Sequence, residues 1–132
     1  MANIQTLAEC FAHFGAVCAS RRFSKSAVTQ DGQTVVVAMW EDEVQRDGDR
    51  IAYESRYKPR LKGKVRSVDS ELIANLKWAR DHCFGLVRVV IVAAEDVTAE
   101  PRKIVCCYPD DNLVMRVTGF DRRTRTFSAE SV

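Results

Sequence analysis

The chain has 132 residues, of which 46% are hydrophobic and 29% are charged, with 20 basic and 18 acidic side chains. This composition is ordinary for a globular domain, and it indicates neither a disordered chain nor a fibrous repeat. A chain of this length buries about two thirds of its unfolded surface, which is enough for one core without disulfides. We therefore expect a single domain over residues 1–132.

The first expected element is a helix over residues 3–14. Its apolar residues recur every three or four positions, as on one face of an amphipathic helix. Asn3 can cap the start, and Gly15 can supply the left-handed residue at the end. The apolar face consists of Ile4, Leu7, Ala8, Phe11 and Phe14.

A β-hairpin is expected next, because the runs SAVTQ and TVVVAMW flank the turn pair Asp31-Gly32. Apolar residues occupy both faces of the second run, so it is predicted to be an inner strand. Residues 41–50 are rich in acidic side chains, and Asp47-Gly48 predicts a further turn. Residues 51–58 then alternate as a half-exposed strand does.

A second helix is expected to begin at Ser67, which can cap it, and to end at Gly85. Trp78 projects away from the predicted apolar face of this helix. That face consists of Leu72, Ile73, Leu76, Ala79 and Cys83.

The run LVRVVIVAA at residues 86–94 predicts a central strand, since it is apolar and β-branched throughout. KIVCCY is then expected as a strand, PDDN as a turn, LVMRVTGF as a strand and TFSAESV as the last strand. The order is helix, two or three strands, helix and four strands. The fold class is therefore α+β, with one mostly antiparallel sheet of about five to seven strands and two helices.

This order of elements resembles the general build of PUA-like modules, some of which read modified bases in nucleic acid. The resemblance rests on element order and matches no motif residue by residue, so it is an analogy about the fold. It implies that Trp40, Tyr53, Tyr57 and Trp78 are candidates for a cage that accepts a base.

Positive charge is concentrated in RYKPRLKGKVR, at residues 56–66, which holds six basic residues and no acid. Fourteen basic and eighteen acidic residues remain elsewhere, a net charge of −4. Pro59 and Gly63 break regular structure in this stretch and predict a loop. Cations beside aromatic rings suit nucleic acid, because cations neutralise phosphates and rings stack on bases. The candidate binding residues are Trp40, Tyr53, Arg56, Tyr57, Lys58, Arg60, Lys62, Lys64, Arg66, Trp78, Arg122, Arg123 and Arg125.

A partner protein is the alternative, because an acidic turn and a basic loop can dock through complementary charge. An inhibitor or adaptor from a phage or mobile element would have such features. The sequence is also compatible with a homodimer. A pI near 8.3 is lower than that of most dedicated DNA-binding domains.

Catalysis is not indicated, because the chain has no Gly-rich phosphate loop, no G-x-S-x-G and no H-E-x-x-H. We assign no catalytic residue. Cys10 and His13 would lie on one side of a helix, with Cys18, His82 or Cys83 as further zinc ligands. The paired C-x-x-C ligands of structural zinc sites are missing, so we expect no metal and no cofactor.

The predicted location is the cytoplasm, without contact with a membrane. The N-terminal MANIQTLAECF lacks the basic start and apolar run of a signal peptide. The longest apolar run is interrupted by Arg88 and is shorter than the roughly 20 residues that span a bilayer. Five cysteines, an odd number without framework spacing, indicate thiols in a reducing compartment.

Overall fold

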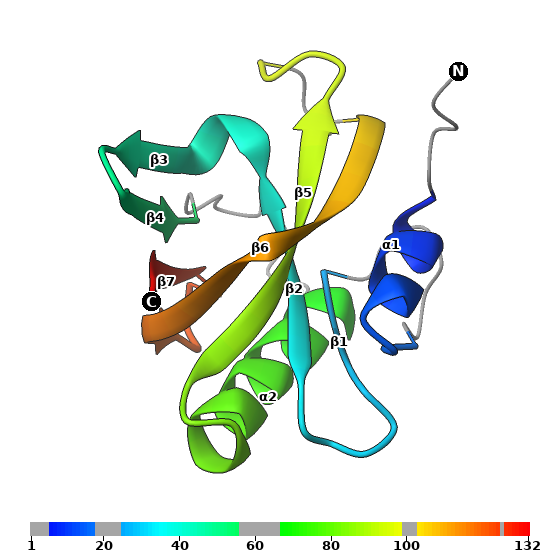
Figure 1. The fold of residues 1–132 in the computed structure, drawn as a ribbon, viewed down its shortest axis with the longest axis vertical. Coiled ribbons are helices and arrows are strands. Elements are labelled where there is room, and N and C mark those ends of the chain that lie inside the picture. Colours follow the sequence, from blue (N-terminus) through cyan, green and yellow to red (C-terminus); the bar gives the residue numbers. More distant parts are fainter. Residues whose placement is uncertain (1–5, 18–24, 56–66, 99–102, 125) are drawn as a thin grey trace.

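A computed structural model describes residues 6–17, 25–55, 67–98, 103–124 and 126–132 of the chain. These residues form a seven-stranded sheet with one α-helix packed on each face (Figure 1). The strands lie in the order β1-β2-β5-β6-β7-β4-β3. The helices are α1 (Leu7–His13) and α2 (Ser67–His82), and the strands are β1 (Ser26–Val28), β2 (Val35–Trp40), β3 (Val44–Asp47), β4 (Arg50–Glu54), β5 (Leu86–Ala94), β6 (Ile104–Asp121) and β7 (Thr126–Ser131).

Helix α1 begins later than its apolar pattern predicted. Thr6 is the N-cap, and its side chain accepts a hydrogen bond from the Glu9 amide while the Glu9 side chain accepts one from the Thr6 amide. This reciprocal capping box satisfies two amides that the first turn leaves without helical partners. The described helix is thus capped by Thr6, whereas Asn3, the expected cap, lies outside the described residues. Gly15 follows the helix with a φ of +84°, as predicted.

Strand β2 is an inner strand, as its two apolar faces predicted. It pairs antiparallel with β1 across the Asp31-Gly32 turn and parallel with β5 on its other side. Val35, Val37 and Met39 face α2, whereas Val36 lies in the cluster under α1. The parallel pairing requires a long crossover connection, and α2 forms part of it.

Helix α2 buries the apolar face that the sequence indicated. All five predicted residues lie in the larger hydrophobic cluster, which also holds the inner residues of β5, β6 and β7. Leu76 is fully buried in this cluster. Strand β5 runs through the middle of the sheet and contributes to the clusters on both faces, which confirms the expected central strand.

The acidic segment after β2 leads to the other edge of the sheet. A short 3₁₀ helix (Glu41–Glu43) connects β2 to β3, which pairs with β4 across the turn at Asp47-Gly48. Strand β4 then pairs with β7. The two predicted turns in this half of the chain are therefore confirmed.

Strand β6 runs continuously through the PDDN stretch that was predicted to be a turn. Val89 pairs with Asp110 and Arg88 pairs with Val114, so residues 111–113 form a bulge in one strand. The expected order of elements is consequently wrong, because the described strands number four before α2 and three after it. A bulge kinks a strand without ending its pairing.

The coarse fold class is confirmed: this is an α+β domain with a mostly antiparallel sheet and two helices. None of the helices in the described ranges has the length and apolar character needed to cross a bilayer.

Candidate binding surface

Most of the predicted binding residues lie outside the described part of the chain. This group consists of Arg56, Tyr57, Lys58, Arg60, Lys62, Lys64, Arg66 and Arg125. The structure places the remaining five, which are Trp40, Tyr53, Trp78, Arg122 and Arg123, and it places the residues at which the basic segment 56–66 joins the sheet and α2.

Tyr53 lies in the core and is not exposed to a ligand. Its hydroxyl donates a hydrogen bond to Oε2 of the buried Glu43 at 3.0 Å, and its ring packs edge-on against Phe127 with centroids 5.2 Å apart. Burial and the nearby Glu43 carboxylate raise the pKa of the Tyr53 phenol well above its ordinary value. The predicted role of Tyr53 in stacking on a base therefore does not fit its position.

The two tryptophans do not converge on one cage. Trp40 is half-buried and packs against the cluster under α1, whereas Trp78 belongs to α2 on the opposite face of the sheet. The Trp78 indole donates a hydrogen bond to the Gly32 carbonyl at 2.8 Å, and its ring lies 3.9 Å from that of His82. Trp78 thus holds the β1–β2 turn against α2, although 41% of it is exposed.

The end of β4 is held firmly at the point where segment 56–66 begins. The Ser55 amide donates to the Phe127 carbonyl at 3.0 Å, and the Phe127 amide donates to the Ser55 hydroxyl at 2.8 Å. Phe127 is the cross-strand neighbour of Phe120 near the end of β6. Ser55, the last described residue before the basic segment, therefore lies beside the strands that flank the β6–β7 turn.

That turn presents Arg122 and Arg123, both exposed. The Asp121 carboxylate accepts a hydrogen bond from the Arg123 amide at 2.8 Å, which shapes the turn as an Asx motif. Because β7 begins at Thr126, only a few residues separate these arginines from the Ser55–Phe127 hydrogen bonds. Sequence reasoning selected the arginines by charge, and the sheet register brings them near Ser55, the residue that precedes segment 56–66.

Helix α2 adds cations from the neighbouring side. The Arg80 guanidinium lies 5.5 Å from the Phe120 ring centroid, within range of a cation–π interaction. Arg80 also donates a hydrogen bond to Asp81, which lowers the pKa of that carboxyl, and the charge of Lys77 acts in the same direction. The cations in the second half of α2 and on the β6–β7 turn are called the basic corner: Lys77, Arg80, Arg122 and Arg123.

Charge is divided unevenly along the chain. The described residues hold 10 Lys and Arg against 17 Asp and Glu, a net charge of −7, whereas the other residues hold 10 against 1, a net charge of +9. An anionic ligand is therefore repelled by most of the described surface. The basic corner is an exception, since its four cations outnumber the nearby Asp81 and Asp121.

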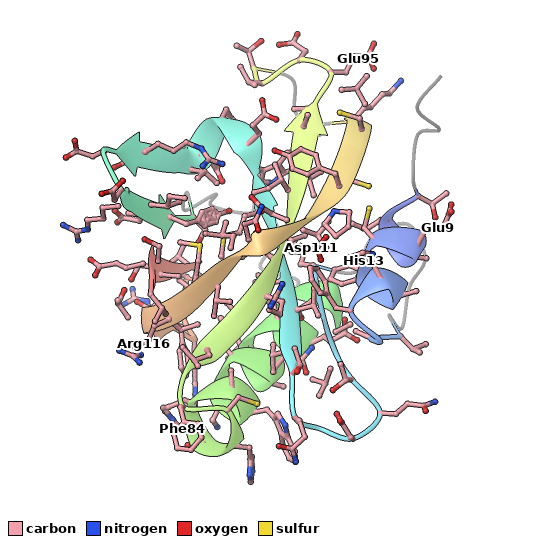
Figure 2. The ribbon with its side chains drawn as sticks, in the orientation of Figure 1. Glu9, His13, Phe84, Glu95, Asp111 and Arg116 are labelled. Carbon is pink, nitrogen blue, oxygen red and sulfur yellow. The ribbon has the colours of Figure 1, made fainter. Side chains whose placement is uncertain are left out.

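The cysteines and histidines considered as zinc ligands take other partners. Cys10 Sγ lies 3.3 Å from Cys107 Sγ in the core, and His13 Nε2 lies 2.6 Å from the Asp111 carboxylate, toward which it points in Figure 2. No three His, Cys, Asp or Glu side chains within the described ranges gather as a metal site. Cys18 lies outside those ranges.

Both contacts were missed by sequence reasoning, because each joins residues almost a hundred positions apart. No local pattern signals such a pair. Burial is the main reason why the pKa of the Cys10 thiol is raised to about 12, with a further contribution from Cys107.

Comparisons with protein-family models, with curated proteins and with solved structures find no match for this chain. The PUA-like resemblance is accordingly not confirmed by any structural neighbour.

Proposed function

We propose that the protein is a small non-catalytic module that binds nucleic acid through segment 56–66 together with the basic corner. The observation that carries the proposal is the pair of hydrogen bonds between Ser55 and Phe127. They hold Ser55, which precedes the six cations in the sequence, beside the strand that follows Arg122 and Arg123. Cations from distant parts of the sequence can thus contact one anionic ligand.

Phosphate neutralisation supplies the affinity in this proposal. Each Lys or Arg that contacts a phosphate releases condensed counterions, so affinity falls steeply as salt increases. Arginine also binds phosphate oxygens through two parallel hydrogen bonds, which lysine cannot do. The net charge of −7 on the described residues repels the nucleic acid elsewhere and thereby restricts it to the basic surface.

The proposal is tested by fluorescence anisotropy with labelled mixed-sequence DNA and RNA, single-stranded and duplex, between 50 and 200 mM salt. We expect the logarithm of the association constant to fall linearly with the logarithm of the salt concentration. The slope should be about −0.7 to −0.9 for each phosphate contact. Replacing Arg56, Lys58, Arg60, Lys62 and Lys64 by glutamine should weaken binding at least about tenfold and flatten this slope. Thermal stability should hardly change, because solvated charges contribute little to it.

A double variant tests the described part of the surface separately. Arg122→Gln with Arg123→Gln should weaken binding and reduce the magnitude of the salt slope by about 1 to 2. The matched control is Arg46→Gln with Lys103→Gln, which removes the same charge away from the basic corner and should leave binding unchanged. Equal losses in both double variants would show that net charge, and not this surface, governs binding.

A second candidate function is binding to another protein through the first half of β6. In the described sheet, β7 pairs with β6 only from Met115 onward, so residues 104–110 have a neighbouring strand on one side alone. This edge exposes the apolar side chains of Ile104, Val105 and Tyr108. Such an edge is a template for an added strand. Absence of nucleic-acid binding at 50 mM salt would favour this candidate over the first.

A further inference from the structure

Phe84 combines two unfavourable features at the corner between α2 and β5. It is 87% exposed, the highest value among the large hydrophobic residues of the described chain. Its φ of +58° is also the only positive value among the described non-glycine residues. Bulky residues rarely adopt this left-handed conformation, and exposure of a phenylalanine loses the benefit of burial. Strain that persists at an exposed position is a reason to look for a function there.

The backbone around Phe84 is firmly held. The Gly85 amide donates to the Ala79 carbonyl at 2.8 Å and closes the end of α2, while the Val117 amide donates to the Gly85 carbonyl at 2.8 Å and ties the corner to β6. The preceding residue, Cys83, is buried in the main hydrophobic cluster. Phe84 is therefore presented on a fixed support, at the lower end of the molecule in Figure 2.

Two cations lie on the elements that adjoin Phe84, which are β6 and α2. Arg116 approaches Gly85 so closely that a Cβ on that glycine would lie 3.6 Å from Arg116 Cγ. Figure 2 shows Arg116 at the same end of the molecule as Phe84. Arg80, a member of the basic corner, lies in the last turn of α2, four residues before Phe84, which follows the end of the helix. An apolar protein segment would have to desolvate these charges, whereas a nucleotide places its phosphates beside them.

We propose that the Phe84 ring is a stacking platform for an unpaired base of nucleic acid held at the basic corner, so that the preferred ligand is single-stranded. This inference rests on the proposed function and specifies its ligand. An exposed ring can stack on any base, because every base has a flat π-face. Bases within a duplex are already stacked on one another and cannot reach such a platform.

The experiment compares three labelled ligands of equal length: a mixed-sequence single strand, an abasic single strand with the same phosphates, and a duplex. Phe84→Ala should weaken binding of the base-containing strand by roughly 5-fold to 150-fold, as expected for the loss of one stack. Binding of the abasic strand should change less than about twofold. Phe84→Trp, which keeps a stacking surface, should restore the affinity, and circular dichroism should confirm that both variants are folded.

The outcomes separate this inference from the proposed function. If the unmodified protein binds the single strand and Phe84→Ala binds it equally well, the stacking role is overturned while nucleic-acid binding stands. A matching loss for the abasic strand would also overturn it, since the effect would then not depend on bases. If the unmodified protein binds none of the three ligands at 50 mM salt, the proposed function itself fails.

Discussion

Phe11→Ala is expected to lower the free energy of unfolding by about 3–5 kcal/mol, because it removes a large side chain from a packed interior. Phe11 is completely buried in the cluster that joins α1 to β2 and β5. Helix α1 has only seven residues, too few to be stable by itself, so its position depends on this packing. Urea unfolding followed by circular dichroism measures the change.

The chain supplies a matched control in Phe84→Ala. The same substitution at a residue that is 87% exposed should change stability by no more than about 0.5 kcal/mol. A small effect of Phe11→Ala would mean that α1 packs loosely against the sheet. A large effect of Phe84→Ala would mean that its ring has a structural role, which would also contradict the stacking proposal.

Raising the pH above 9 is expected to destabilise the protein through its buried thiols. The pKa of Cys10 is raised from 9.0 to about 12 in the folded chain, chiefly because burial disfavours the thiolate. The unfolded chain therefore loses this proton at a lower pH than the folded chain. The folded state therefore keeps its full free energy of unfolding from this group below pH 9. As the pH rises toward 12, the free energy of unfolding falls at a rate approaching about 1.4 kcal/mol per pH unit.

Urea titrations at pH 7.5, 9, 10 and 11 with a reducing agent test this expectation. The free energy of unfolding of the Cys10→Ala variant should decline less steeply than that of the unmodified protein over this pH range. Part of the slope will remain, because burial also raises the pKa of Cys83, Cys107 and Tyr53. Parallel curves for the two proteins would show that Cys10 does not favour its protonated form in the folded state.

The domain separates the residues that maintain the fold from those proposed to bind. The two hydrophobic clusters lie on the two faces of the sheet under α1 and α2. The basic corner and Phe84 lie at the end of α2 and at the adjoining ends of β5 and β6, where exposed side chains contribute little to either cluster. Substitutions on the proposed surface can thus be read as binding effects.

Local patterns predicted the elements whose signals lie within a few residues. The spacing of Leu72, Leu76 and Ala79 identified the buried face of α2, because apolar residues one helical turn apart must share a face. The pair Asp31-Gly32 identified the first hairpin, since glycine adopts the positive φ that this turn requires. Of the proposed surface, the sequence identified Arg122 and Arg123 through their charge.

Tertiary contacts decided the features that no local pattern contains. The PDDN stretch has the composition of a turn, yet pairing with β5 on both sides of the bulge keeps β6 continuous. The alternation of apolar and polar residues predicted that Tyr53 lies in a strand. Its contacts with Glu43 and Phe127 show that the Tyr53 side chain is on the buried face of that strand.

The sequence by itself therefore determined the fold class, the buried face of α2 and the concentration of positive charge in residues 56–66. Only the tertiary structure placed Ser55, the residue before that segment, beside the start of β7 and left Phe84 exposed. The physical reason is the range of the interactions. Helical and strand periodicity acts over a few residues, whereas sheet register joins residues as distant as Ser55 and Phe127.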